Sequence, residues 1–314
     1  MKAKQFFAIT ALGAALFASC SNEEELATGS YPSDNLIRVT AGVNNDMTRG
    51  DEAVTPTSLT QNFSLTVVNN TNNNFSYANE IFSLNGTEWS CGKNLLWQNL
   101  STPVEIVALY PAKDANTFSG VYSKENNTVG TINYSVNSDQ SKSTADDDAN
   151  DLLLYHNASY VPENDRKDGK LNIQFDHAFC RVDIEVTIGS EFNATDGLAA
   201  NPIKRIRVEG TKTTADISFA SAETTFTPTG DATNITPTPG DFTPAASATD
   251  QAVAKYSCIV IPQTATLKVL LHTSDREFEW TGKQMTLESG KQYTLQLNMK
   301  KSATARKFIL RERK

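Results

Sequence analysis

Residues that could form a catalytic or metal site are few in this sequence. It contains three histidines, none near cysteines at a spacing typical of zinc ligands. The acidic residues Asp146–Asp148 suggest calcium, but an EF-hand loop starting there needs glycine and glutamate where the chain has Asp151 and Asn157. A Gly-x-Ser-x-Gly turn and a glycine-rich phosphate loop are both missing from the sequence. The sequence therefore predicts no metal, no cofactor and no enzymatic activity.

A covalent modification is expected at Cys20. A positively charged start precedes the apolar run Phe6–Phe17, and the small residues Ala18 and Ser19 come directly before the cysteine. This is the layout of a secretory signal peptide, and the run is shorter than the about 20 residues of a membrane-spanning helix. The stretch resembles a bacterial lipobox, whose cysteine carries lipid. Residues 1–19 are predicted to be a signal peptide and Cys20 the point of lipid attachment.

The residues after Cys20 are polar and acidic. Glu23–Glu25 resembles the surface-export signal of Bacteroidetes lipoproteins, and it also suits a solvated tether. We expect residues 20–35 to hold the following domains away from the outer membrane of a Gram-negative cell, with the protein at the cell surface.

Charge and cysteine content narrow the function further. The net charge is −8, which argues against nucleic-acid binding because neutralising phosphates needs a basic face. Cys180 and Cys258 both lie in strand-like runs. A disulfide between them and a pair of buried free thiols both remain open, since sequence separation says nothing about distance.

The rest of the chain has the pattern of β-strands separated by polar turns. In Phe179–Ile188 apolar and polar residues alternate, and Tyr293–Met299 repeats that pattern. Val104–Leu109 is denser in apolar residues and suits a central strand. No long 3.6-residue apolar period is present, so helices should be few and short. Many short strands with such turns favour an all-β protein made of sandwiches or barrels.

A polar segment, 156–170, divides the strand-rich chain and is expected to be a linker. It predicts an N-terminal β-domain over residues 36–160, a C-terminal β-domain over 161–300 and a basic tail over 301–314.

Several short motifs, in this order, resemble the Bacteroidetes fimbrillin family of major and minor fimbrial subunit lipoproteins. They are the lipobox cysteine, Met47-Thr48-Arg49, Ala108-Leu109-Tyr110-Pro111, Asp151-Leu152-Leu153-Leu154, Phe175-Asp176-His177-Ala178, Ile261-Pro262-Gln263 and Gly290-Lys291-Gln292-Tyr293-Thr294. The resemblance implies two transthyretin-like antiparallel β-sandwich domains in tandem. It also implies a fimbrial subunit or fimbria-associated adhesin.

The resemblance further implies how such a subunit assembles. The segment 36–43 is a candidate first strand, and its alternating side chains would fill a groove: Ile37, Val39, Ala41 and Val43. In relatives, a protease cuts after such a strand, and the matching bond here joins Arg49 to Gly50. Losing the strand would expose a sheet edge that another subunit can fill by donor-strand complementation. The alternative is that 36–43 remains an ordinary core strand.

The basic tail leaves two interpretations open. Phe308 and Leu310 could fill two pockets of a groove in a neighbour. A solvated end, or a contact with anionic surface lipid, is favoured because the tail is short and rich in Lys and Arg.

Two other classes of function are open to this sequence. A surface glycan-binding lipoprotein outside any fibre could use Trp89, Trp97 and Trp280 as a sugar platform, if they are exposed. A hydrolase would need a cluster of titratable side chains in a cleft. The expected partners are other fimbrial subunits, either copies of this chain or related proteins, joined by strand addition. The outer membrane, through the lipid, and a ligand on a host or bacterial surface are the other two.

Overall fold

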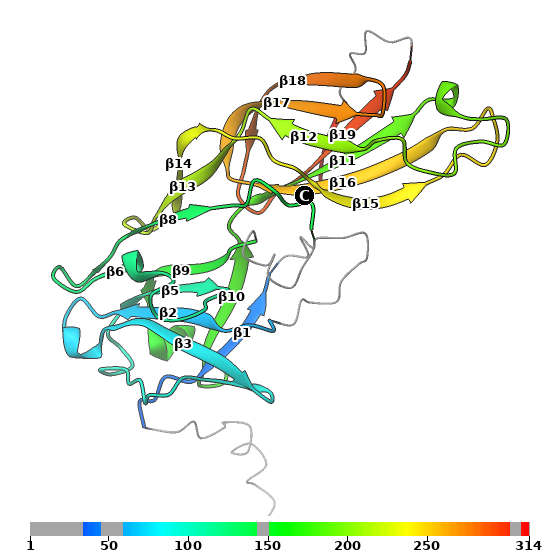
Figure 1. Cartoon of the computed structure of the whole chain (residues 1–314). Helices are drawn as coiled ribbons and strands as arrows, with labels where there is room; N and C mark the ends of the chain where they lie inside the picture. Colours follow the sequence, from blue (N-terminus) through cyan, green and yellow to red (C-terminus); the bar gives the residue numbers. More distant parts are fainter. Residues whose placement is uncertain (1–33, 45–58, 143–150, 302–308, 314) are drawn as a thin grey trace, which may run out of the picture. The chain divides into compact units, whose positions relative to one another are not determined.

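The computed structural model describes residues 34–44, 59–142, 151–301 and 309–313, and for 309–313 only the backbone (Figure 1). From Asn35 onward these residues belong to one compact unit. Strands dominate, and the one α-helix in the described part, α1 (Pro162–Asp165), is a single turn. No helix among the described residues is long and apolar enough to cross a membrane. The all-β prediction is confirmed.

Seven strands of the first half close into a barrel (Figure 1). Around the ring they are β1 (Val39–Val43), β10 (Leu171–His177), β9 (Leu153–Tyr160), β5 (Val104–Tyr110), β2 (Phe63–Val68), β3 (Tyr77–Asn85) and β4 (Glu88–Ser90). The ring closes where β1 meets β4, at the single pair Val39 and Trp89. One apolar cluster fills the interior, with Phe63 stacked on Phe82 at a centroid distance of 5.2 Å.

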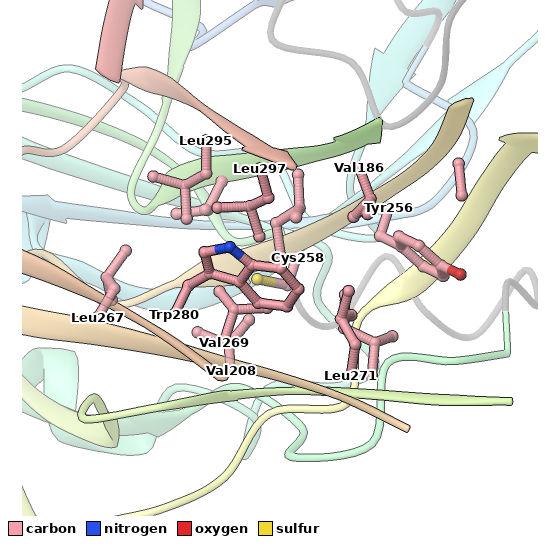
Figure 2. Packing of buried hydrophobic residues seen from close by; sticks show 14 of the residues in the cluster. Val186, Val208, Tyr256, Cys258, Leu267, Val269, Leu271, Trp280, Leu295 and Leu297 are labelled. Carbon is pink, nitrogen blue, oxygen red and sulfur yellow. The ribbon is translucent and has the colours of Figure 1, made fainter. Parts of the chain in front are cut away.

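The second half packs two sheets face to face. One sheet contains β15 (Thr238–Thr243), β16 (Ala252–Val260), β11 (Cys180–Ile188), β19 (Gln292–Met299) and β20 (Ile309–Arg313). The other contains β12 (Arg205–Glu209), β17 (Gln263–His272) and β18 (Glu277–Leu287). Figure 2 shows the core between them, where the Trp280 ring lies among Val269, Leu295 and Leu297. Alternation along each strand produces this core, since every second side chain points inward.

A third small sheet joins the halves. It is formed by β14 (Thr225–Ala232), β13 (Lys212–Ser218) and β8 (Thr131–Ser135), and a two-stranded ribbon, β6 (Tyr122–Ser123) and β7 (Thr128–Val129), precedes β8. β8 comes from the first half of the chain, but it pairs with β13 from the second. A third apolar cluster includes Val107 and Leu109 of the barrel together with Phe219 and Ile259 of the second half. The two halves therefore share a core.

The expected boundary between residues 160 and 161 separates two strands that pair with each other. β9 ends at Tyr160, and β10 returns beside it in the barrel and also pairs with β1. After β10 the chain leaves the barrel between His177 and Cys180, where β11 begins. The polar segment 161–170 is thus a connection inside the barrel, and its polarity reflects exposure to solvent.

Both second-half cysteines are free thiols and buried. Cys180 lies opposite Val260 and Cys258 opposite Val182, so the two are diagonal neighbours on paired strands. Diagonal neighbours lie about 7–8 Å apart, beyond the usual span of a disulfide. Of the two alternatives left open by the sequence, the structure has the free thiols.

The C-terminal tail differs from the favoured expectation of a solvated end. β20 forms an antiparallel edge strand on β19, with Leu310 paired to Leu295 and Arg313 to Gln292. The apolar residues in a basic tail were a signal for this pairing. The reason is that β19 is buried on one face but would otherwise leave its backbone edge open.

Candidate functional site

Of the two neighbours of β1 in the barrel, only β10 pairs with it along its whole length. β1 and β10 run parallel over five residue pairs, from Val39 with Leu171 to Val43 with Phe175. Backbone hydrogen bonds extend this pairing at both ends: the Leu171 amide donates to the Arg38 carbonyl and the Asn44 amide to the Phe175 carbonyl, each at 2.8 Å. In Figure 1, β1 (blue) lies beside β10 (green), although about 130 residues separate them.

The opposite edge of β1 is bonded only near its start. The Ile37 amide donates to the Leu95 carbonyl and the Trp97 amide to the Asn35 carbonyl, both at 2.8 Å. Beyond the pair of Val39 with Trp89, no further residue of β1 pairs with β4 in the described part of the chain. The contact between β1 and β4 therefore has the fewest paired residues of any two neighbouring strands in the barrel. Backbone groups without a partner in the ladder must bond to solvent or to side chains.

The inward side chains of β1 contribute to the barrel core. Ile37 and Val39 are 6% and 5% exposed, while Ala41 and Val43 are half-buried and pack against the same cluster. All four therefore lie on the side that the alternation assigns to the interior. Their role as fillers of an exchangeable groove stays a prediction.

The outward face of β1 meets a row of polar side chains on β10. The Thr40 hydroxyl donates to Asn172 Oδ1 at 3.0 Å, and Gln174 Nε2 donates to the same oxygen at 3.1 Å. After the strand, Asn44 Nδ2 donates to Asp176 Oδ1 at 3.2 Å. Sequence reasoning missed this row, whose only signal is the polar alternation of β10.

Two polar atoms are buried without a partner near the start of β1. Trp97 and Tyr160 stack with ring centroids 5.8 Å apart, and neither the indole N–H nor the phenol hydroxyl has a hydrogen-bond partner among the described residues. Burial is the main cause that raises the pKa of Tyr160 above its usual value. Each such buried donor typically costs about 1–3 kcal/mol, so this end of the barrel is less stable than its apolar packing suggests.

Three sequence-predicted site residues lie outside the described residues. They are Cys20, Arg49 and Gly50. The described chain ends after β1 at Asn44, five residues before Arg49, and resumes at Leu59.

The tryptophans do not form an exposed platform. Trp97 and Trp280 are 3% and 2% exposed, and Trp89 is half-buried with its ring 4.9 Å from that of Phe63. Their packing is that of core aromatics, so the observation that would have favoured a sugar-binding surface is not met.

One polar cluster was not anticipated from the sequence. His156 on β9 accepts or donates through both ring nitrogens, at 3.0 Å to a Glu105 oxygen and 3.2 Å to the Thr224 hydroxyl. The imidazole is almost fully buried, and its ring lies edge-on to Phe219. The cluster joins β5 and β9 to the residue preceding β14, so its geometry is that of a tie between sheets. Among the described residues, no group of three potential metal ligands is present.

The comparisons with known proteins agree with this architecture. The chain matches the family described as fimbrillin-like over residues 38–308. The match spans most of the sequence, and the chain belongs to the fimbrillin-like family. The resemblance inferred from the ordered motifs is thereby confirmed. No curated protein matches the chain.

Two solved structures show the same fold at low sequence identity. A candidate cell adhesion protein from Bacteroides ovatus is 14% identical, with a TM-score of 0.55 over 90% of this chain and 97% of that one. Another from Bacteroides uniformis is 15% identical, with a TM-score of 0.55 over 90% of this chain and 98% of that one. At such low identity the likeness concerns the fold alone.

Proposed function

We propose that this protein is a fimbrial subunit or fimbria-associated adhesin, which reaches the cell surface as a lipoprotein and joins other subunits by strand addition at β1. Membership of the fimbrillin-like family supports the fimbrial role. The observation that carries the proposed mechanism is the one-sided hold on β1, which β10 pairs along its length and β4 touches at one residue.

Cleavage after β1 would allow a strand from a neighbouring subunit to replace it. Cleavage between Arg49 and Gly50 cuts the chain on the C-terminal side of β1 without altering its contacts. Burial of side chains such as Ile37 and Val39 contributes about 1.5–3 kcal/mol each, so the cut strand stays bound at first. It has lost the millimolar effective concentration that the covalent link supplied. A strand from a neighbour can then compete for the β10 edge and the pockets.

The lipid and the absence of catalysis complete the proposal. Cys20 carries the acyl chains that hold the uncut protein at the outer membrane, and two or more chains anchor stably. The proposal includes no enzymatic activity. In support, the His156 cluster is buried and ties sheets together, with its imidazole edge-on to Phe219.

The test is the N-terminal residue of the protein recovered from sheared surface fibres, compared with the membrane fraction. We expect chains starting at Gly50 in the fibres and chains starting at lipidated Cys20 in the membrane. Arg49→Ala should leave only the second form and prevent entry into fibres. The matched control is Arg38→Ala, at the arginine directly before β1, which should still yield chains starting at Gly50.

Two outcomes would contradict this proposal. Fibres that contain the chain with an intact Arg49–Gly50 bond would rule out processing there. A chain that always starts at Cys20 and never enters fibres would favour an anchor or a free-standing surface lipoprotein, such as one that binds glycans.

A further inference from the structure

The inner face of β1 requires apolar side chains in any strand that replaces it. Ile37 and Val39 are almost fully buried, and the β10 residues beside them, Leu171 and Ile173, have no exposed surface. Ala41 occupies the next inward position and is small. A charged side chain at the position of Ile37 or Val39 would lose its hydration without gaining a partner, which is strongly unfavourable. At the half-buried position of Ala41, a long charged side chain would replace a small apolar one that packs against the barrel core.

The outer face adds a limit on size. Gly42 faces Gln174, and a Cβ at position 42 would lie 3.3 Å from Gln174 Oε1. That is tighter than an ordinary van der Waals contact, so the end of the Gln174 side chain, which also bonds to Asn172, would have to shift to admit a larger residue. Thr40 bonds to the same Asn172 oxygen through its hydroxyl. The outer face thus favours a hydroxyl residue followed by a very small one.

The C-terminal tail of this protein does not match that pattern in any register. Any four alternating residues between Lys300 and Lys314, in either direction, include at least one Lys, Arg or Glu. Placing Phe308 and Leu310 in the central positions leaves Arg306 and Glu312 at the ends, so one of these charges takes the buried position of Ile37. Shifting the register to exclude Glu312 moves Arg306 to an inner position.

From these constraints we infer that the strand replacing β1 comes from a different fimbrial subunit and not from the tail of a second copy of this chain. Its sequence has apolar side chains at four alternating positions, with a hydroxyl residue and a very small residue between them. The inference rests on the strand addition proposed above and identifies its partner. The tail keeps the place it has here, on the edge of β19.

The experiment uses the full chain cut between Arg49 and Gly50, with a fluorophore on the piece that contains β1. Displacement of that piece is measured by fluorescence anisotropy as unlabelled peptides are added. The peptides are Asn35–Asn44, its Gly42→Val variant, Lys300–Lys314, and Lys300–Lys314 carrying Arg306→Val and Glu312→Val. Uncut chain serves as the control for non-specific binding.

We expect the Asn35–Asn44 peptide to displace β1, and the tail peptide to need at least a tenfold higher concentration. The Gly42→Val peptide should be several-fold weaker than its parent, and the doubly substituted tail should gain about tenfold over the natural tail. A tail peptide as effective as Asn35–Asn44 would overturn the inference and leave strand addition standing. Failure of the Asn35–Asn44 peptide itself would overturn strand addition at β1 and the inference with it.

Discussion

At the scale of single residues, two buried tyrosines of the barrel differ in the hydrogen bonding of their hydroxyl groups. Tyr110 accepts hydrogen bonds at its hydroxyl from the amides of Thr60 and Gln61, both at 3.3 Å. The Tyr160 hydroxyl is buried without a partner among the described residues. Removing a partnered hydroxyl leaves donors unpaired, whereas removing an unpartnered one relieves a desolvation cost.

Tyr160→Phe should therefore leave the free energy of unfolding unchanged or raise it by about 1 kcal/mol. Tyr110→Phe, a chemically identical change, should lower it by about 1 kcal/mol. Urea denaturation of both variants and the parent measures the difference. A loss of stability in Tyr160→Phe as large as that in Tyr110→Phe would show that the Tyr160 hydroxyl has a partner.

The thiol of Cys180 has a consequence for stability at alkaline pH. Burial first, and the neighbouring Cys258 second, raise the pKa of Cys180, whose thiol donates to the Val260 carbonyl at 3.0 Å. In the unfolded chain a cysteine ionises near pH 8.5. Above that pH the unfolded state loses a proton that the folded state keeps, so this group makes stability fall as pH rises.

We expect the unfolding free energy to decrease between pH 8.5 and 9.5, and Cys180→Val to reduce that decrease by about 1 kcal/mol. Urea denaturation at pH 7.5, 8.5 and 9.5 measures both slopes, and Cys180→Ala controls for the added volume of valine. Equal slopes in the parent and both variants would show that the Cys180 thiol ionises in the folded protein.

At the scale of elements, β20 covers one edge of β19, and β11 covers the other in a parallel register. The hydrogen bonds on the two edges are independent, so removing the tail should open only one of them. A chain ending at Lys301 keeps every strand except β20.

This truncated chain should show faster amide hydrogen exchange in β19, at residues Gln292–Gln296, than the full chain. Exchange in β11 and β16 should stay the same, because their pairing does not involve the tail. Exchange measured by mass spectrometry distinguishes these segments. Unchanged protection of β19 would mean that β20 does not cover it in solution.

At the scale of the whole described unit, the third apolar cluster and one buried side chain connect the first half of the chain to the second. Gln140 accepts from the Ile259 amide and donates to the Ile259 carbonyl, both at 2.9 Å, and so pairs with β16 as a strand would. Phe219, in the third cluster, is fully buried and contacts His156 of the barrel strand β9. A core shared by both halves favours one cooperative unfolding transition.

We therefore expect a single calorimetric transition, with equal calorimetric and van't Hoff enthalpies. Phe219→Ala should lower stability by about 3–5 kcal/mol and shift that transition as a whole. Leu84→Ala, at a side chain that is 43% exposed, is the matched control and should change little. Two resolved transitions, only one of them shifted by Phe219→Ala, would mean that the halves fold separately.

Local pattern was enough to predict several strands and the fold class. The prediction was wrong for residues 225–243, whose turn-type residues suggested a connection, whereas the structure has β14 and β15 there. The alternation in Phe179–Ile188 and Tyr293–Met299 anticipated β11 and β19, and the apolar run Val104–Leu109 anticipated β5. These signals are local, since a period of two residues reports which face of a strand is buried. The ordered motifs indicated the family because they, too, are short local sequences.

Only the tertiary structure decided which strands are neighbours. Nothing near Leu171–His177 indicates that it pairs with β1, or that β8 crosses to β13, because the partners lie far away along the chain. The polarity of 156–170 suggested a domain boundary, but residues 156–160 belong to β9, and the polarity of the rest suits any exposed connection. Likewise, the basic character of the tail predicted solvation, whereas the open backbone edge of β19 decided its pairing. Sequence determined the elements and their buried faces, and long-range pairing of backbone edges determined the site around β1.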